Sequence, residues 1–258
     1  MARCDLSGLM LRRVPIPDLS AGDRTLGDAL AHYVAHVLRM RPGETFVAFD
    51  PSTGLEADAS ILPSRGPDDA IDIRLGAPRP GVVRARRSVI WIQALAKGTK
   101  CDAVVRDATE LGATRVIVAA AKRSVVRLDA ARAAARADRW TRIAREAARQ
   151  SGRAIAPGID APRSWEDALG CVDDDHDRFC LWEQATEPLG PRLLSSLERS
   201  AGLAFACGPE GGLDVEEIEL ARRRGWSVVS LGPRLLRTET VAAAVLGAVE
   251  IASRAFAP

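Results

Sequence analysis

The residues best suited to chemistry in this 258-residue sequence lie in two loops, each of which follows a short apolar run. The first is Cys207-Gly208-Pro209-Glu210-Gly211-Gly212-Leu213-Asp214, and the second is Leu231-Gly232-Pro233-Arg234-Leu235-Leu236-Arg237-Thr238-Glu239-Thr240. Glycines allow positive φ and let a ligand approach the backbone closely. Two such loops side by side would present main-chain donors and carbonyl groups to a flat, polar small molecule. One loop alone could be an ordinary strand-to-helix turn, but the pair, with Arg237 and Glu239, favours a ligand site.

A helix is predicted to begin directly after the first loop. Asp214 can cap this helix, and Glu217, three residues later, completes a capping box. Leu213 and Ile218 have the spacing of the flanking hydrophobic staple. The start signal therefore sets where the loop ends and the helix begins.

Residues 82–258 alternate between short apolar runs and helical patterns. We predict strands at Val89–Leu95, Arg115–Ala120, Phe179–Trp182, Leu203–Cys207 and Val228–Leu231, and helices at about 101–112, 129–151, 189–199, 214–224 and 239–256. This alternation predicts an α/β fold with a parallel sheet covered on both faces. Ligands bind such sheets at the carboxyl ends of the strands, which is where both loops fall.

Residues 1–75 have a different pattern, that of a small β-rich domain with one helix. The helix is predicted at Thr25–Arg39, and strands are predicted at Glu44–Phe49, Leu55–Ile61 and Ala70–Leu75. In the second of these strands apolar and polar residues alternate, as in a half-buried strand. The proline- and glycine-rich segment 76–81 then predicts a linker.

The net charge of +2 conceals an uneven distribution. Residues 76–160 carry 18 basic and 7 acidic residues, whereas the segments on either side are acidic overall. A middle third this basic fits a polyanion-binding face. An arginine-rich, solvated helix would explain the charge equally well, so charge alone leaves both interpretations open.

Two basic segments stand where a polyanion could reach them. Lys122-Arg123-Ser124 follows the predicted strand Arg115–Ala120 and so falls at the edge of the sheet where substrates bind. Arg149, Gln150 and Arg153 lie at the end of the predicted helix 129–151. Phosphate contacts would explain these residues, and so would a solvated helix face.

Several function classes lack their motifs. The sequence has no dinucleotide-binding GxGxxG, no P-loop GxxxxGK[ST] and no hydrolase GxSxG. The five cysteines form no CxxC pair, and three histidines supply a metal or triad site poorly, so we predict no metal. We interpret His32 and His36, spaced i, i+4, as partly buried polar residues. With no apolar run near the roughly 20 residues of a membrane span and no signal-peptide pattern, we expect a cytoplasmic protein with free thiols.

Six ordered segments together resemble one family. They are His36-Val37-Leu38-Arg39, Thr109-Glu110-Leu111-Gly112, Lys122-Arg123-Ser124, Glu146-Ala147-Ala148-Arg149-Gln150-Ser151-Gly152-Arg153, Gly208-Pro209-Glu210-Gly211-Gly212 and the second loop, 231–240. In this order they resemble the RsmE family, the small-subunit (16S) ribosomal RNA uridine-N3 methyltransferases of the SPOUT superfamily. Leu213 and Val241 stand where the family pattern leads us to expect Phe and Ala, and both are apolar exchanges.

The resemblance implies an RNA-binding PUA-like β-barrel at residues 1–75 and a SPOUT α/β domain at 82–258, with a parallel sheet and a deep trefoil knot. It also implies a homodimer whose active site lies near the subunit interface. S-adenosylmethionine would be held by Leu181, Glu183, Gly208, Pro209, Glu210, Gly211, Gly212, Leu231, Gly232, Leu236, Arg237 and Thr240. The 16S ribosomal RNA of the small subunit would contact Arg39, Lys122, Arg123, Arg149, Gln150 and Arg153.

The implied reaction is displacement at a sulfonium methyl group by N3 of a uracil. N3 must first lose its proton, and the resulting charge spreads onto the carbonyl oxygens of the base. An arginine beside those oxygens would stabilise this charge, and we assign that role to Arg237 with Arg123 or Arg153 as helper. Glu239 could accept the proton, bind cofactor or favour a helix N-terminus. A ribose 2′-O-methyltransferase of the same superfamily and a non-catalytic RNA-binding protein remain as alternatives.

Overall fold

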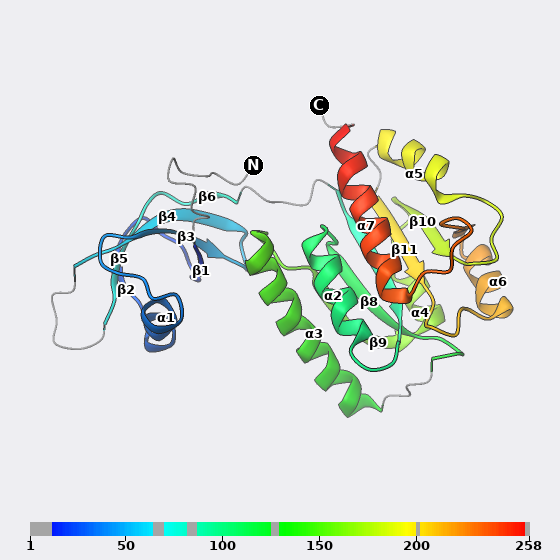
Figure 1. Cartoon of the computed structure of the whole chain (residues 1–258), viewed down its shortest axis with the longest axis horizontal. Coiled ribbons are helices and arrows are strands. Elements are labelled where there is room, and N and C mark those ends of the chain that lie inside the picture. The colour runs from blue at the N-terminus through cyan, green and yellow to red at the C-terminus, as the bar shows by residue number, and fades with distance from the viewer. Residues whose placement is uncertain (1–11, 64–69, 82–86, 125–128, 200–201, 256–258) are drawn as a thin grey trace. The chain divides into compact units, whose positions relative to one another are not determined.

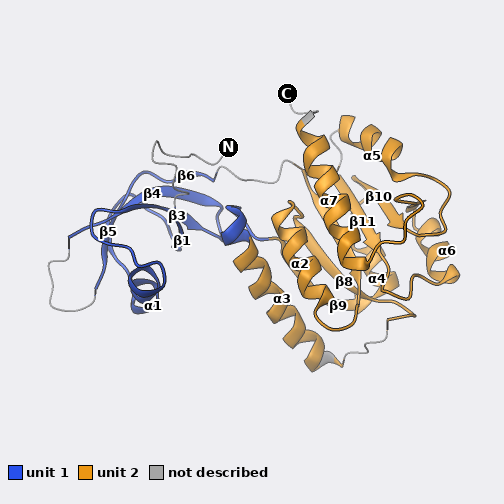
Figure 2. Cartoon of the chain, in the orientation of Figure 1, with its two compact units in different colours: residues 1–84, 148–156 blue, residues 85–147, 157–258 orange. Residues whose placement is uncertain are grey.

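The computed structural model describes residues 12–63, 70–81, 87–124, 129–199 and 202–255. The chain forms two compact units, coloured separately in Figure 2. Unit 1 comprises residues 1–84 and 148–156, and unit 2 comprises residues 85–147 and 157–258. Figure 1 labels most of the helices and strands of both units.

The sheet of unit 2 has six strands, and every pair of neighbours in it is parallel. Its order is β12-β10-β11-β7-β8-β9. These strands are β7 (Val89–Ala94), β8 (Arg115–Ala120), β9 (Gly158–Ser164), β10 (His176–Leu181), β11 (Gly202–Cys207) and β12 (Ser227–Val229). The predicted α/β class with a parallel sheet is confirmed.

Helices cover both faces of this sheet and bury a separate apolar cluster on each. One cluster includes side chains of α2 (Lys100–Glu110), α3 (Ala130–Ser151), α5 (Leu189–Glu198) and α7 (Thr238–Ala255). The other includes side chains of α4 (Trp165–Gly170) and α6 (Val215–Arg223). Alternate residues of β7 divide between the clusters, Trp91 facing the first and Ile90 and Ile92 the second, as the two-residue period of a strand requires.

Most elements of unit 2 lie within a few residues of their predicted positions, but one strand and one helix were missed. These are β9 and α4, which follow one another between residues 158 and 170. The β9 sequence, Gly158-Ile159-Asp160-Ala161-Pro162-Arg163-Ser164, is polar and contains a proline, and every residue in it is at least partly exposed. It is an edge strand, the position where proline and charge are tolerated, so it lacks the apolar signal of a buried strand.

Unit 1 contains a second sheet of six short strands with the order β1-β3-β4-β5-β2, in which β6 also pairs with β4. The strands are β1 (Arg13–Pro15), β2 (Gly22–Thr25), β3 (Thr45–Asp50), β4 (Leu55–Ile61), β5 (Asp72–Leu75) and β6 (Arg79–Pro80). The strand β4 has the predicted bounds. The predicted helix Thr25–Arg39 is shorter, consisting of α1 (Asp28–His32) and a π-helical turn, η1 (Tyr33–Val37).

Two features of unit 1 differ from the sequence-based division of the chain. Strand β6 lies inside 76–81, the predicted linker, and pairs antiparallel with β4. Residues 148–156, at the end of the long helix, belong to unit 1 although they are distant from it in the sequence. Gly81 packs against Ala154 so closely that a Cβ at Gly81 would lie 2.5 Å from the Ala154 Cβ. Such a contact joins segments that no local pattern connects.

A glycine in unit 2 gives a direct test of packing at the start of β11. A Cβ at Gly202 would lie 2.6 Å from Cδ2 of the His176 ring, whose Nε2 is 2.8 Å from Ser88 Oγ. We expect Gly202→Ala to lower the free energy of unfolding by about 1–3 kcal/mol, because the ring must leave this position. Gly190→Ala is the matched control, since a Cβ there meets nothing within 4 Å. Urea denaturation measures both, and equal stability of the two variants would contradict the prediction.

Candidate functional site

A cavity of about 510 Å³ lies in unit 2 where three parallel strands end together. Its lining includes the last residues of β10 and β11, Leu181 and Cys207, and the loop that follows β12. Most of the residues predicted to bind a cofactor line it: Leu181, Glu183, Gly208, Pro209, Glu210, Gly211, Gly212, Leu231, Gly232, Leu236 and Arg237. The two loops that the sequence singled out therefore meet in one cavity.

A buried hydrogen-bond network joins the two loops. The Thr238 hydroxyl, at the start of α7, donates to the Gly208 carbonyl over 2.9 Å. The Gln93 amide Nε2 donates to Thr238 Oγ1 over 2.8 Å and lies 3.4 Å from the same carbonyl. Gln93 and Thr238 are 1% and 5% exposed. Because buried polar groups are costly unless paired, these bonds fix the position of one loop relative to the other.

Gln93 was missed by sequence reasoning, although a signal for it was present. It is the one polar residue in the apolar run Val89–Leu95. A polar side chain at a strand position that the neighbouring residues mark as buried indicates a hydrogen-bonding role. In the structure its Oε1 accepts from the Trp91 indole over 3.2 Å, so both ends of the amide are used.

The first loop needs glycine at its narrowest points. Gly212 has φ +72°, and a Cβ there would lie 2.8 Å from Glu183 Oε1. Both residues line the cavity. A Cβ on Gly208 would lie 3.0 Å from Leu213 Cγ. The left-handed conformation and the close contacts both disfavour larger residues at these positions. The cavity is thus bounded closely by backbone.

Glu210 ties this loop to the segment that follows β7. Its Oε1 accepts from the Lys97 N–H over 3.0 Å and from Lys100 Nζ over 3.0 Å. Burial, the largest influence on its pKa, raises it, but hydrogen bonds from its own N–H, Lys100 and Lys97 outweigh burial and lower it. Glu210 is therefore an anion at neutral pH with its charge turned toward the start of α2.

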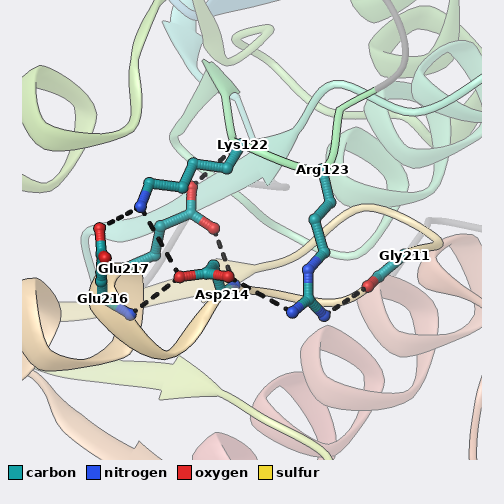
Figure 3. A network of polar contacts seen from close by, with 6 residues as sticks. All are labelled: Lys122, Arg123, Gly211, Asp214, Glu216 and Glu217. Carbon is teal, nitrogen blue, oxygen red and sulfur yellow. Dashed lines mark hydrogen bonds and ion pairs between the residues drawn. The ribbon is translucent and has the colours of Figure 1, made fainter.

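Lys122 and Arg123, predicted to contact RNA, form an internal network with the start of α6 (Figure 3). The guanidinium of Arg123 donates to the Gly211 carbonyl over 3.2 Å and to Asp214 Oδ2 over 3.4 Å. Lys122 Nζ pairs with Glu216 and lies 3.7 Å from Asp214 Oδ1. Both basic side chains are about half exposed, at 51% for Lys122 and 50% for Arg123. They hold the first loop in place, and Arg123 is not part of the cavity lining.

The predicted capping box at Asp214 is confirmed. The Glu216 N–H donates to Asp214 Oδ1 over 3.1 Å, and the Asp214 N–H donates to Glu217 Oε2 over 2.9 Å. The other carboxylate oxygen of Glu217 accepts from the Lys122 N–H over 2.8 Å. The end of the first loop is thereby joined to the end of β8 as well as to its own helix.

Three residues of the second loop that were predicted to act in binding or catalysis lie in three different environments. Arg237 is exposed and lines the cavity, and within the described part of the chain no carboxylate pairs with it. Glu239 lies in the first turn of α7, and its Oε2 is a buried atom without a hydrogen-bond partner among the described residues. Thr240 is exposed and does not line the cavity, because it lies two residues after the buried Thr238 and so faces the opposite side of α7.

The remaining residues predicted to bind RNA belong to unit 1. Arg39 and Gln150 are exposed. Arg149 is half-buried, donates to the Tyr33 hydroxyl over 2.6 Å and lies 5.7 Å from the centre of its ring. Arg153 is buried, at 5% exposed, because it follows the end of α3 into unit 1. A guanidinium this deeply buried is poorly exposed for a contact with RNA.

Other chemistries find little support in the described residues. No group of three His, Cys, Asp or Glu side chains among them could hold a metal ion. The four cysteines outside the first eleven residues are unpaired, and burial raises the pKa of the Cys207 thiol to about 12 although Thr238 opposes this. A thiol of that pKa is a poor nucleophile. No helix in the described ranges has the length and apolarity to span a membrane.

Residues 84–250 match the family model of the RNA methyltransferase domain. The chain is 34% identical to the ribosomal RNA small subunit methyltransferase E of Mycobacterium bovis over 92% of this chain and 88% of that protein. It is 31% identical to the protein of the same name from Bacillus subtilis, over 84% of this chain and 86% of the relative.

Solved structures resemble most of the chain. One is the ribosomal RNA small subunit methyltransferase E from Neisseria gonorrhoeae bound to S-adenosyl methionine, with 27% identity and a TM-score of 0.81 over 93% of this chain and 97% of that one. Another is a putative methyltransferase from Legionella pneumophila in complex with the same cofactor, with 25% identity and a TM-score of 0.76 over 95% and 98%.

Removing the Thr238 hydroxyl should loosen both loops. Thr238→Val keeps the shape of the side chain but leaves the Gly208 carbonyl and one Gln93 donor without this partner. We expect the free energy of unfolding to fall by about 1–3 kcal/mol. Thr238→Ser retains the hydroxyl, so its free energy of unfolding should fall by less than that of Thr238→Val. Urea denaturation compares the three proteins, and a Val variant as stable as the Ser variant would show that the network is dispensable.

Protonation of Asp214 at acid pH should lower the stability of the protein, because this carboxylate caps the start of α6. The hydrogen bond from the Glu216 N–H, aided by the charges of Lys122 and Arg123, lowers the pKa of this carboxyl. A group whose pKa is lower in the folded state adds stability that is complete above its unfolded pKa of about 3.9 and is lost as pH falls through the folded value. Asp214→Asn keeps a capping oxygen without the charge, so its urea midpoint should fall less than that of the wild type between pH 5 and pH 3. An equal fall of the urea midpoint in the two proteins would contradict this prediction.

Proposed function

Because this chain belongs to the family of ribosomal RNA small subunit methyltransferases E, we propose that it transfers a methyl group from S-adenosylmethionine to N3 of a uridine in the 16S RNA of the small ribosomal subunit. The observation that carries the proposal is the cavity at the ends of β10, β11 and β12, which is bounded by both loops and joined by the Thr238 network. A small-subunit RNA substrate would place this activity in the cytoplasm, as the sequence predicts.

The lining fits the cofactor. A cavity of about 510 Å³ is within the range of small-molecule sites. Leu181, Leu213 and Val241 provide apolar surface suited to a flat base. Gly208 and Gly212 leave backbone groups open to polar atoms of a ligand, where a Cβ would intrude. These residues would hold S-adenosylmethionine, which when bound supplies a methyl group already activated by its sulfonium.

The task left to the protein is to orient the uracil and to manage the N3 proton. Arg237 lines the cavity and has no carboxylate partner among the described residues, so its charge is available to a developing negative charge on a uracil carbonyl oxygen. Glu239, in the first turn of α7, has a buried carboxylate oxygen that lacks a donor among the described residues. Glu239 is not part of the cavity lining, so this buried carboxylate suits a structural group near the helix N-terminus better than a direct acceptor of the N3 proton.

Arg123 fits a supporting role better than a direct one. Its guanidinium donates hydrogen bonds to the Gly211 carbonyl and to Asp214, and Arg123 itself does not line the cavity. We therefore propose that Arg123 positions the first loop and that Arg237 is the arginine that meets the substrate. Lys122, half exposed beside it, can still contribute to binding RNA phosphates.

The domain roles extend the same proposal. Unit 1 would be the PUA-like RNA-binding domain, and unit 2 would carry the trefoil knot of the superfamily. A homodimer with the site near the subunit interface is supported by the apolar side chains that the second loop exposes, with Leu235 at 83% and Leu236 at 40% exposed. Exposed apolar groups beside a cavity are suited to being covered by a partner subunit.

Identification of the labelled nucleoside tests the function. The protein is incubated with radiolabelled S-adenosylmethionine and small ribosomal subunits that lack the modification, and the RNA is digested. We expect the label in N3-methyluridine. Label in a 2′-O-methyl nucleoside would overturn the chemistry, and neither label nor cofactor binding would favour a non-catalytic RNA-binding protein.

Arg237→Ala tests the assignment of the charge-stabilising residue. We expect kcat for methyl transfer to fall by about 100- to 1,000-fold, as when one such donor is removed from an enzyme. Arg234→Ala removes an arginine from the same loop and the same cavity lining, and should retain most of the activity. S-adenosylmethionine affinity, measured by calorimetry, separates lost binding from lost catalysis. An unchanged kcat in the Arg237 variant would contradict the assignment of Arg237 as the charge-stabilising residue.

A further inference from the structure

The segment from His32 to Arg41 in unit 1 turns an unusual set of side chains toward solvent. It begins at the end of α1, which is drawn in dark blue in Figure 1, and continues through η1. Ala31 and Val34 are buried in the core of this unit. On the outer side, His32 and His36 are exposed, and Val37 is 60% exposed. The expectation that the two histidines are partly buried was wrong, since the apolar residues between them occupy the inner face.

The two histidine rings form a pair at the surface. Their centroids are 4.7 Å apart, and the ring planes are inclined by 34°. Two histidines could begin a metal site, but among the described residues no third ligand joins them. The pair therefore presents flat π surface to solvent, which is the kind of surface on which an unpaired base stacks.

Arg39, three residues after His36, occupies a backbone position that favours glycine. Its φ is +52°, and it follows the last residues of the helical segment. The Met40 N–H donates to the Val34 carbonyl over 3.0 Å, which closes the helix end around Arg39. Glycine at such a position ends a helix without strain. Stability alone therefore does not account for an arginine here.

Arg39 and Arg41 have no ion pair among the described residues, in contrast to four other arginines of unit 1. Arg12, Arg13, Arg74 and Arg79 each form an ion pair with a carboxylate. In the described part of the chain no carboxylate pairs with the guanidinium of Arg39 or Arg41. Two free cations next to an exposed ring pair combine the two interactions by which proteins hold single strands, namely base stacking and phosphate contact.

We propose that His32, His36, Arg39 and Arg41 form a binding surface for unpaired nucleotides of RNA. A base stacks on the histidine pair, and Arg39 and Arg41 bind the phosphates on either side of it. This surface recognises single strands without reading their sequence, because every base has a π face. The inference rests on the proposed function in taking RNA as the substrate, and it adds the site in unit 1 at which a single-stranded part of that RNA is held.

The test measures binding of a fluorescent oligouridylate of twelve nucleotides to the full-length protein by anisotropy. His32→Ala/His36→Ala should weaken binding at least about 5-fold, the loss expected for one stacked base. His32→Phe/His36→Phe keeps the π surfaces and should bind like the wild type. A blunt RNA duplex of the same length should bind the wild type and the Ala variant equally. Equal oligouridylate binding by the Ala variant and the wild type, or failure of the wild type to bind it, would overturn the proposal.

Arg39→Gly separates the binding role from a structural one. Because glycine suits φ +52°, this variant should unfold at the same temperature as the wild type or higher. Its oligouridylate binding should be weaker, and the slope of log affinity against log salt should fall by about 0.7, the value for one phosphate contact with a single strand. Arg74→Ala removes a paired arginine from the same unit and should change neither the affinity for oligouridylate nor its salt dependence. A stable Arg39 variant with unchanged affinity and slope would overturn the proposal.

Methyl transfer to small ribosomal subunits keeps this inference distinguishable from the proposed function. If the wild type forms N3-methyluridine and the histidine variants bind oligouridylate as it does, the binding surface is wrong and the function stands. If the wild type transfers no methyl group but the same variants lose oligouridylate binding, the surface stands and the function is wrong.

Discussion

The candidate site depends on the hydroxyl of Thr238 and the two buried groups that it connects. It donates to the carbonyl of Gly208, in the loop after β11, and accepts from the amide of Gln93, in β7. These segments are far apart in the sequence, and a buried hydroxyl that donates and accepts fixes their separation and orientation. Leaving any member unpaired in the interior is costly, so the network tolerates few arrangements. This constraint holds the two loops in the positions from which both line the cavity.

Sheet topology explains why this constraint can operate. In a parallel sheet the carboxyl ends of all strands lie at one edge, so the loops after β10, β11 and β12 start side by side. Apolar clusters on both faces hold the strands in register, with Trp91, Phe179 and Phe205 packed together on one face. Rigid strands and helices thus carry a loop-built cavity, which suits the binding of a ligand by backbone groups.

Charge in this protein is used more for internal structure than its distribution along the sequence suggests. The basic middle third contains Arg115, which pairs with Asp160, Arg139, which pairs with Asp102, and Lys122, which pairs with Glu216. A paired cation offers less to a polyanion than a free one, because a phosphate must compete with a carboxylate already in place. Arg237, Arg39 and Arg41 have no carboxylate partner among the described residues, so their guanidinium groups are better suited to bind an anion than these paired cations are.

Local patterns in the sequence determined the α/β class, the bounds of β4 and β8, the capping box at Asp214 and the two loops of the cavity. Each of these depends on residues close together in the chain, such as Asp214 and Glu217. Tertiary structure alone decided the rest. The polar edge strand β9 pairs with β8, residues 148–156 pack in unit 1, Arg153 is buried, and Gln93 meets Thr238. These features result from contacts between residues distant in sequence, whose free energy depends on the three-dimensional neighbours that each residue acquires on folding.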